Sequence, residues 1–523
     1  MSTTLRICAP LLETLKRYHL DKEQPVERLS YVFGRRVQAG DRVILLIPNQ
    51  VPVLFAPDCF VHQSGGHVSL DAAVLNAMLV EFAASDWDVI INVHDHWFCR
   101  GGTRFSGVDD ADDLAFGCYL HQRFEPMLAA HPEIGVARAV TLAALVLDQT
   151  SLDARIVGTE SEAPFLPIDT VQVIGEHFRR IVPNGSRTDA AAPAAADEVH
   201  ARHADFIARE TLQALAYMRI ALVGCGGLGS IIGEGLVRLG ARRLVLVDGD
   251  RLEMTNLNRW QGGRLQDLGR HKAELLAERI AGYAEDTDVE CVAGSLHSEQ
   301  ARQALRRCDL LIGGLDNDVA RVTLNRFAAQ YLVPYFDAGV RVQAGTRVDF
   351  QSRYFSVLPG TTGCLECSRS NLIDREAVSL ALHDPLTRAA RAAAGYVTGA
   401  PELSAPSVYA LNLRISSLLL TELLNYFAGY RRTATTYYDS WRNDLARRFD
   451  GDSFDDRPSE DCPVCSYYHG RGDTEPLPTP GGDVERLDRL LAEADAFAGA
   501  IRRKRHRRRA HDCAFAVTPS RHL

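Results

Sequence analysis

The first part of the chain alternates short apolar runs with stretches of helical periodicity. Residues 42–48 and 87–93 are apolar runs that predict strands, and residues 70–85 place apolar side chains on one helical face between them. A further apolar run at residues 137–148 predicts another strand. This alternation indicates an α/β domain over residues 1–170.

The pattern stops near the middle of the chain. Residues 183–197 are rich in Ala, Pro, Gly, Ser and Asp and have no apolar period, so a linker is expected over residues 171–198. A second α/β domain is expected over residues 199–468. The remainder, residues 469–523, opens with a Pro/Gly-rich stretch and then shows one amphipathic helical pattern, near residues 484–501, before a basic tail.

Composition and charge limit the class of protein. The chain has 523 residues, 46% of them hydrophobic and 24% charged, which excludes a mostly disordered, collagen-like or coiled-coil protein. The sequence has no apolar run of about 18 residues and no secretory signal, so we expect a cytoplasmic protein without a membrane span. The net charge is −9, although residues 502–509 are almost all Lys or Arg. We interpret this run as a solvated tail and do not expect a nucleic-acid partner, because no aromatic side chain is interleaved with it.

The strongest local pattern is a glycine loop at the start of the second domain. An apolar run at residues 220–223 leads into this loop and then into a helical pattern, and a second run at residues 244–247 ends in Asp248. Glycines let the backbone approach a phosphate, and an acid after the second strand can bind ribose hydroxyls. Alone, the pattern predicts a nucleotide site such as that of a nicotinamide dehydrogenase. The loop glycines are Gly224, Gly226, Gly227 and Gly229.

The residues that follow favour ATP over a nicotinamide cofactor. Asp250 is followed by Asn256 and Arg259, and Lys272 comes further along the chain. Lys and Arg around one phosphate site suit a triphosphate, and Asp316, at the end of a later apolar run, suits Mg²⁺. The combination predicts ATP–Mg²⁺ chemistry.

In the order of these motifs, residues 199–468 resemble the ubiquitin-activating-enzyme-like adenylyltransferases, which include the ThiF- and MoeB-type proteins. The resemblance implies a Rossmann-like fold. It also implies attack of a protein's C-terminal glycine carboxylate on the α-phosphorus of ATP, which yields an acyl-adenylate and pyrophosphate. Positioning and charge neutralisation would do most of the catalysis.

The same resemblance assigns roles to individual residues. The glycine loop would hold ATP, and an arginine before the loop would reach the active site of a partner subunit in a homodimer. Arg202 lies at about that place, and a surface helix arginine is the alternative. The remaining implied contacts to ATP and Mg²⁺ are Asp248, Asp250, Asn256, Arg259, Lys272 and Asp316.

Two Cys-x-x-Cys pairs, Cys364 with Cys367 and Cys462 with Cys465, form a four-thiolate set. Twelve cysteines in a chain without an export signal indicate a reducing compartment, where thiols bind metals rather than cross-link. Two such pairs supply the four soft ligands of a structural zinc site. The alternative, four unrelated buried thiols, fits this spacing poorly.

Ubiquitin-activating enzymes carry a separate thioester cysteine after the first Cys pair, and this chain has none between Cys367 and Cys462. The protein hands its adenylate to an outside thiol, uses a cysteine from elsewhere, or has lost its nucleophile by substitution. The sequence leaves these three explanations open, and no thioester cysteine is predicted. The corresponding loop, residues 395–412, offers Thr398, Ala400 and Ser404 instead.

The first domain carries a second set of candidate metal ligands. His94 and His96 end a predicted strand, Asp109 follows in Ser106-x-x-Asp109, and Glu27 lies upstream. Two histidines and an aspartate leave one zinc position open for water, and a glutamate can then act as a base.

This ligand set resembles that of the JAB/MPN (JAMM) metalloproteases, which cut ubiquitin-like proteins from their targets. The resemblance covers about residues 5–150 and implies a JAB/MPN-like α/β fold with a zinc site. Two features depart from the family pattern: Trp97 replaces the usual proline, and Gly101 and Gly102 lengthen the segment before Ser106. A domain that only binds its partner is the alternative.

The two resemblances together indicate a bacterial-type enzyme that adenylates a ubiquitin-like protein and passes it to a conjugating-enzyme-like partner. Bacterial operons for such conjugation, including anti-phage ones, contain similar pairs of domains. One alternative is a sulfur-carrier adenylyltransferase of cofactor or natural-product synthesis. Another is a non-catalytic scaffold that binds a ubiquitin-like protein.

Overall fold

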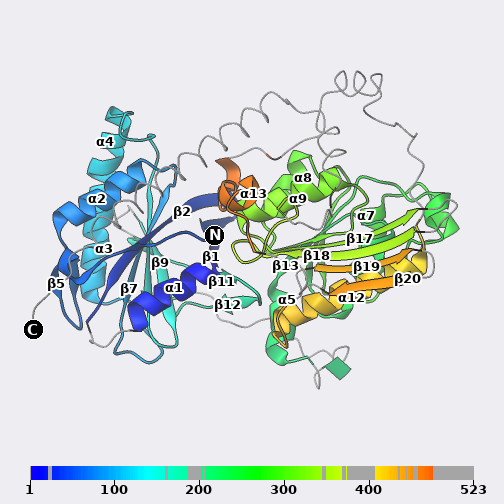
Figure 1. Cartoon of the computed structure of the whole chain (residues 1–523), viewed down its shortest axis with the longest axis horizontal. Coiled ribbons are helices and arrows are strands. Elements are labelled where there is room, and N and C mark those ends of the chain that lie inside the picture. Colours follow the sequence, from blue (N-terminus) through cyan, green and yellow to red (C-terminus); the bar gives the residue numbers. More distant parts are fainter. Residues whose placement is uncertain are drawn as a thin grey trace, which may run out of the picture.

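The computed structural model of the chain consists of two α/β lobes that lie side by side (Figure 1). The first lobe is built from the N-terminal 186 residues, and the second begins near residue 207. The structure describes residues 2–21, 26–158, 163–186, 202–203, 207–343, 349–367, 373, 407–433, 436–442, 445–450, 457–474 and 477.

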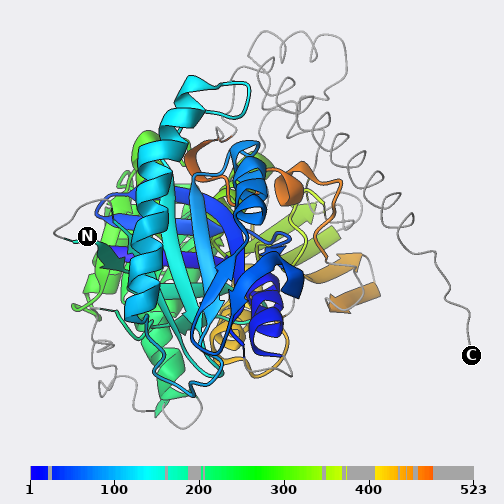
Figure 2. The ribbon, with the colours of Figure 1, turned by 90° about the vertical axis from the view of Figure 1, so that its left-hand side faces the viewer.

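The first lobe is a ten-stranded mixed sheet with the order β10-β9-β8-β7-β2-β3-β1-β11-β12, in which β4 also pairs with β2. Helix α1 (Ala9–Leu20) packs on one face, and α2 (Ala72–Ala83), α3 (Gly107–Tyr119) and α4 (Glu125–Ala130) cover the other face (Figure 2). A short hairpin, β5 (Phe60–Gln63) and β6 (Val68–Leu70), lies outside this sheet. The strands are β1 (Ser2–Cys8), β2 (Leu29–Ala39), β3 (Arg42–Ile47), β4 (Val53–Leu54), β7 (Val89–Asp95), β8 (Thr141–Leu147), β9 (Leu152–Val157), β10 (Phe165–Pro167), β11 (Thr170–Ile174) and β12 (Arg179–Ile181).

The first lobe extends further along the chain than the sequence pattern predicts. The expected strands and helix are present as β3, β7, β8 and α2. However, β11 and β12, which fall in the expected linker over residues 171–198, belong to the first sheet. Strand β11 is buried along its whole length and pairs in parallel with β1, from Thr4↔Thr170 to Cys8↔Ile174. Residues 187–201, which hold most of the low-complexity stretch, lie outside the described residues.

The second lobe is an eight-stranded sheet with the order β15-β14-β13-β16-β17-β18-β19-β20. The first five strands are parallel, and β18 to β20 add antiparallel hairpins. The strands are β13 (Arg219–Val223), β14 (Arg243–Val247), β15 (Asp288–Val292), β16 (Leu310–Gly313), β17 (Tyr335–Gln343), β18 (Asp349–Val357), β19 (Thr436–Arg442) and β20 (Leu445–Asp450).

Helices cover both faces of this second sheet. One core includes α5 (Arg209–Tyr217), α6 (Gly227–Arg238), α7 (Lys272–Ala281) and α12 (Tyr409–Ala428). The other includes α8 (Glu299–Arg306), α9 (Asp318–Tyr331) and α13 (Pro463–Ser466). None of the helices in the described residues is long and apolar enough to cross a membrane. The helix expected at residues 484–501 and the basic tail lie outside the described residues.

The two lobes share one hydrophobic core, which explains the unbroken apolar run of β3. Val43, Leu45 and Ile47 face the core that contains α1. Ile44 and Leu46 face the opposite way and join the core that contains α8 and α9 of the second lobe. A strand that is buried on both faces has no polar alternation, so β3 reads as continuous hydrophobic sequence.

A polar network crosses the same interface. Arg6 on β1 is fully buried. Its guanidinium donates to Gln172 Oε1 at 3.0 Å and to the carbonyl of Tyr331 at 2.9 Å, and it lies 3.3 Å from Asp309 Oδ1. Arg42 Nη1 lies 2.7 Å from the same carboxylate oxygen. The first lobe is therefore anchored to the second by buried charges as well as by apolar packing.

We expect Asp309→Asn to lower the free energy of unfolding by about 3–5 kcal/mol, because Arg6 and Arg42 would keep buried charges without a counter-ion. Burial alone would raise the pKa of Asp309, but Arg42 and Arg6 lower it to about 2. A carboxylate with a lowered pKa stabilises the fold above about pH 4 and loses this effect as the pH falls towards 2. Urea unfolding at pH 7 and pH 3 checks both points: the variant should lose less stability between these pH values than the wild type does.

The matched control for this prediction is Asp288→Asn. Asp288 is largely exposed and lies 3.5 Å from Arg219. Exposed ion pairs contribute about 0–1 kcal/mol, so this variant should unfold almost as the wild type does. Equal losses in the two variants would contradict the role given to Asp309.

Candidate functional sites

The glycine loop lies where three parallel strands of the second sheet end. Strand β13 lies between β14 and β16, and the loop joins β13 to α6. Gly224 has a φ of 89°, and a Cβ atom on it would lie 2.6 Å from the carbonyl oxygen of Gly314. A Cβ atom on Gly229 would lie 1.8 Å from the carbonyl oxygen of Gly224. The loop therefore packs too tightly for side chains at these positions. It lies at the switch point of the sheet, where α/β proteins bind nucleotides.

Two variants that each add one methyl group test where the glycine loop is tightly packed. Gly229→Ala should destabilise the second lobe by about 1–3 kcal/mol or more, as overpacked sites do. Gly226→Ala places its Cβ in open space, with no atom within 4 Å, so the thermal midpoint should stay near that of the wild type. Thermal unfolding of both variants checks this difference. A Gly226→Ala protein as unstable as Gly229→Ala would show that the loop is strained elsewhere.

Asp248 directly follows β14 and fastens the glycine loop. Its carboxylate accepts hydrogen bonds from the Cys225 amide at 2.6 Å and from the Asp250 amide at 2.7 Å. Burial raises the pKa of Asp248, and these amides together with Lys272 partly offset that effect. Lys272, which is buried at the start of α7, places its Nζ 2.8 Å from Asp250 Oδ2. Asp248, Asp250 and Lys272 are thus brought together beside the loop.

Asn256 and Arg259 lie in the turns between β14 and α7. Asn256 Oδ1 accepts a hydrogen bond from the Glu253 amide at 3.1 Å, and Arg259 Nη1 donates to the carbonyl of Thr255 at 2.6 Å. A Cβ atom on Gly227 would lie 3.2 Å from Arg259 Cγ, so this arginine flanks the glycine loop. Its guanidinium is held by the backbone of the preceding turn, and its aliphatic stem lies against the start of α6.

Asp316 lies in the exposed loop between β16 and α9. The sequence pattern did not predict the buried arginine, Arg321, that holds the backbone next to Asp316. Arg321 donates to Asp337 Oδ2 at 3.1 Å and also to the carbonyl of Leu315, the residue just before Asp316. Asn317 caps α9 by accepting the Ala320 amide at 2.9 Å. The backbone on both sides of the Asp316 carboxylate is therefore fixed while the carboxylate itself faces solvent.

Two other predicted features are not joined to this site. Arg202 is exposed in a short turn before α5, and no contact among the described residues links it to the glycine loop. The loop that would carry a thioester cysteine falls largely on residues 395–406, which lie outside the described residues. Thr398, Ala400 and Ser404 are among them. Asn412, at the start of α12, comes closest to the site, because a Cβ on Gly227 would lie 2.6 Å from its Nδ2.

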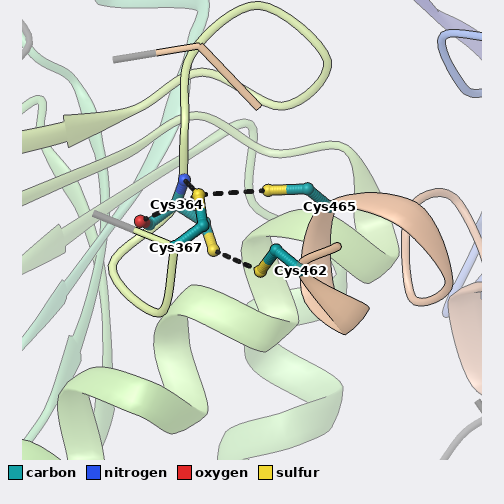
Figure 3. A group of neighbouring side chains, drawn as sticks. All are labelled: Cys364, Cys367, Cys462 and Cys465. Atoms are coloured by element: carbon teal, nitrogen blue, oxygen red, sulfur yellow. Dashed lines mark hydrogen bonds between the residues drawn. The ribbon is translucent and has the colours of Figure 1, made fainter. Parts of the chain in front are cut away.

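The four paired cysteines converge on one point, although the second pair comes almost a hundred residues after the first (Figure 3). The Sγ atoms of Cys364 and Cys462 are 3.5 Å apart, and those of Cys367 and Cys465 are 3.8 Å apart. All four sulfur atoms lie within 4.8 Å of one another. Tetrahedral zinc with Zn–S bonds of about 2.3 Å separates its sulfurs by about 3.8 Å, so the geometry fits a zinc ion.

Helix α9 connects the cysteine cluster to the Asp316 loop. Arg326 donates to both carboxylate oxygens of Glu366, at 2.9 and 3.0 Å, and Asn325 Oδ1 accepts the Leu365 amide at 3.0 Å. Glu366 and Leu365 both lie inside the first Cys-x-x-Cys turn. The N-terminal end of the same helix follows Asp316, and every residue from Ala320 to Tyr331 is buried. Displacement of the first cysteine turn would therefore shift α9 and the Asp316 loop at its N-terminal end.

The candidate ligands of the first lobe also come together. His94, at the end of β7, places its Nε2 3.3 Å from Asp109 Oδ1, and His96 Nε2 lies 3.5 Å from Asp109 Oδ2. Glu27 Oε1 lies 3.9 Å from His96 Nε2. Tetrahedral zinc with bonds of about 2.1 Å separates its ligand atoms by about 3.4 Å, so these three side chains fit a zinc ion. Ser106, which the sequence also singled out, caps α3 and accepts the Asp109 amide.

Electrostatics and shape distinguish this ligand set from an ordinary polar cluster. Burial raises the pKa of Glu27. Burial acts in the same direction on Asp109, but hydrogen bonds from His94 and His96 outweigh it and lower the pKa of that carboxyl. A cavity of about 490 Å³ opens over the set, between the β5–β6 hairpin and helices α2 and α3. The cavity could admit an extended peptide, and Glu27, His94 and Asp109 line it.

The two extra glycines before Ser106 form a turn that supports His96. Gly101 and Gly102 have φ values of 83° and 74°, which favour glycine. The turn is held by Asp148, whose Oδ2 accepts the Gly101 amide at 2.9 Å, and it brings Thr103 Oγ1 to 3.1 Å from His96 Nδ1. A hydroxyl on the remote nitrogen orients a ligating imidazole. The lengthened segment is thus compatible with the ligand set.

The fold and the glycine loop define the second lobe as a Rossmann-like nucleotide-binding domain of an α/β protein. A model of the ThiF family matches residues 200–464, which is more than half of the 523 residues. The chain belongs to the ThiF family. The match does not reach the first lobe, and the JAB/MPN-like assignment of that lobe stays a prediction.

Individual relatives cover smaller parts of the chain. The NEDD8-activating enzyme E1 catalytic subunit of Arabidopsis thaliana is 31% identical over 159 residues, which cover 29% of this chain and 35% of that protein. The sulfur carrier protein ThiS adenylyltransferase of Bacillus subtilis (strain 168) is 28% identical over 151 residues, covering 28% of this chain and 43% of that protein. A crystal structure of E. coli MccB with ATP has a TM-score of 0.38 and 18% identity over 49% of this chain and 69% of that chain. The chain thus spans less than half the length of either curated relative.

Proposed function

We propose that the second lobe adenylates the C-terminal carboxylate of a ubiquitin-like protein. The observation that carries this proposal is the grouping of Asp248, Asp250 and Lys272 beside the glycine loop, with Gly314 and Leu315, which lead into Asp316, packed against Gly224. The glycine loop and α6 would hold the phosphates, with Asp248 on the ribose. Lys272 and Arg259 would neutralise the phosphate charge, and Asp316 would hold Mg²⁺. Lys272 would leave Asp250 when a triphosphate binds.

The names of the relatives support this class of substrate. One of them is named as a NEDD8-activating subunit and another as a ThiS adenylyltransferase, and both names denote activation of a small protein. We therefore propose a cytoplasmic enzyme that works as a homodimer, with Arg202 reaching the partner's site, and that passes its product to a conjugating-enzyme-like protein. A bacterial, anti-phage conjugation pathway is the setting we propose.

ATP–pyrophosphate exchange tests the proposed reaction. Exchange should require ATP, Mg²⁺ and a ubiquitin-like protein that ends in glycine, and mass spectrometry should show an adenylate on that carboxylate. The same protein with its last glycine removed is the control. No exchange with any ubiquitin-like protein encoded beside this chain would refute the proposal.

A second candidate function is sulfur-carrier activation. The similarity to a ThiS adenylyltransferase favours it, as does the lack of any cysteine between Cys367 and Cys462 in the sequence. Formation of a thiocarboxylate on the carrier, in place of transfer to a conjugating enzyme, would decide for this alternative.

For the first lobe we propose zinc-dependent cleavage of a ubiquitin-like protein from its target, as in the JAB/MPN proteases. Zinc held by His94, His96 and Asp109 would supply Lewis acidity toward a peptide carbonyl. Glu27, whose pKa is raised by burial, is suited to take up and return a proton. The cavity between the β5–β6 hairpin and α3 would hold the peptide. Both lobes would then act on the same flexible tail.

A further inference from the structure

Asp95 lies between the two candidate histidine ligands of the first lobe but faces the opposite side of β7. Side chains alternate along a strand, so His94 and His96 share one face and Asp95 takes the other. Its carboxylate is fully buried, where Oδ2 accepts the Arg28 amide at 3.0 Å and lies 3.1 Å from His19 Nδ1. A buried carboxylate needs such partners, and these connect β7 to two other segments.

A serine completes the buried group. His19 is the penultimate residue of α1, and its Nε2 lies 2.8 Å from Ser30 Oγ on β2. This Ser30–His19–Asp95 arrangement resembles the order of a hydrolase triad, but all three side chains are 0% exposed. No substrate can reach the serine hydroxyl, so the group serves the architecture around it.

The position of Arg28 shows what the group holds in place. The antiparallel ladder of β2 and β7 reaches its last pair at Leu29↔His94. Arg28 is the next residue, and its amide donates to the Asp95 side chain where a further ladder bond would otherwise form. Glu27, the proposed base, comes immediately before Arg28. Asp95 thus fastens the segment that carries the base to the strand that carries both histidines.

The other side of Glu27 is held by the hairpin region. The Glu27 amide donates to the carbonyl of Ser64 at 2.8 Å, and Gln63 Nε2 donates to the carbonyl of Glu27 at 2.8 Å. These contacts fix Glu27 relative to the cavity wall. The Asp95 contact fixes it relative to the ligands, which is the distance that matters for proton transfer.

We propose that Asp95, oriented by His19 and Ser30, is a positioning residue that holds Glu27 at its working distance from the His94–His96–Asp109 set. The proposal rests on the proposed metal site of the first lobe. Asp95 touches neither the metal ligands' donor atoms nor the cavity, so it acts through the backbone of Arg28. Changes of such supporting residues typically cost about 10–100-fold in affinity or activity.

Binding of Co²⁺ and acetohydroxamic acid to the full chain tests this proposal. Co²⁺ reports on the ligand set by its visible spectrum, and acetohydroxamic acid gives up a proton to a nearby base when it binds the metal. Asp95→Ala should weaken acetohydroxamate binding at least about 10-fold while the Co²⁺ dissociation constant changes less than about 3-fold. Asp95→Asn keeps an acceptor oxygen for the Arg28 amide and should rescue most of the loss. Glu27→Gln should match Asp95→Ala, and the double variant should lose nothing further, because Asp95→Ala displaces the same proton acceptor that Glu27→Gln removes.

Asp88→Ala is the matched control. Asp88 directly precedes β7 at the opposite end of the same ladder, and its Oδ1 accepts the Arg36 amide of β2 at 2.8 Å. This variant should bind acetohydroxamate as the wild type does. Equal losses for Asp88→Ala and Asp95→Ala, or additive losses in the double variant, would overturn the proposal. If Asp95→Ala does not fold, the same binding measurement is made on His19→Ala. Unchanged acetohydroxamate binding by His19→Ala would overturn the proposal.

Co²⁺ binding by the wild type distinguishes failure of the positioning role from failure of the metal site on which it rests. A wild type that binds no more Co²⁺ than His94→Ala would refute the metal site and the positioning role together. A wild type that binds one additional Co²⁺, with hydroxamate affinity unaffected by Asp95→Ala, would refute the positioning role alone.

Discussion

Asp316→Ala should reduce ATP–pyrophosphate exchange by about 10²–10³-fold, as removal of one electrostatic partner of a transition state does. Asp316 is exposed, and the Arg321–Asp337 pair and the Asn317 cap hold the backbone around it. Because the carboxylate supports no buried contact, its removal should leave the thermal midpoint within about 2 °C of the wild type, in line with other surface substitutions. Exchange kinetics at saturating ATP, together with thermal unfolding, measure the two effects on the same samples.

The control for Asp316→Ala is another exposed acid of the second lobe. Asp286 pairs with Arg242 at 2.9 Å and lies beside the sheet edge near β15. Asp286→Ala should exchange pyrophosphate at the wild-type rate. Full activity of Asp316→Ala at ordinary Mg²⁺ concentrations would remove this residue from the proposed site and would weaken the adenylation proposal as a whole.

The second large effect is expected at the cysteine cluster. Cys462→Ser should abolish tight zinc binding and lower the thermal midpoint of the second lobe by more than about 10 °C. Structural zinc contributes about 10–16 kcal/mol of apparent binding energy in small zinc-binding peptides, which is comparable to the whole stability of a typical domain. Metal analysis of the purified protein should find one zinc fewer than in the wild type, and calorimetry should show the shift.

Cys118→Ser is the matched control, because Cys118 is an exposed, free cysteine on α3 of the first lobe. Its substitution should change neither the zinc content nor the thermal midpoint. A Cys462→Ser protein with full stability and the same zinc content as the wild type would show that the cluster is four thiols held by packing alone.

The sequence predicted best those features that depend on local spacing. The glycine loop could be predicted because close packing at Gly224 and Gly229 admits no other residue. The convergence of the Cys-x-x-Cys pairs could be predicted because this spacing is typical of metal sites. Strands β3, β7 and β8 were visible as apolar runs. The JAB/MPN-like fold, the roles of the site residues and the homodimer remain predictions.

The contacts between distant segments were beyond the reach of the sequence pattern. The sequence around Arg6 does not indicate that this side chain is buried against Asp309, which comes some three hundred residues later. Likewise, the pairing of β11 with β1 depends on tertiary contacts, and its short apolar run lay next to a low-complexity stretch that suggested a linker. Asp95 did carry a usable signal: an aspartate between two histidines on a buried strand must face a second polar group.

The contacts of helix α9 determine the order in which parts of the protein can fold during synthesis. Its N-terminal end carries the Asp316 loop, its middle binds the first cysteine turn, and the carbonyl of Tyr331 at its C-terminal end receives Arg6 from β1. Domains generally form as the chain emerges, N-terminal parts first. The strands of the first lobe and the glycine loop therefore leave the ribosome early, whereas α9 gains its last anchor only after Cys462 and Cys465 have left it. We expect nascent chains that end before residue 462 to bind ATP weakly, so that the proposed adenylation begins only after the second Cys pair has been made.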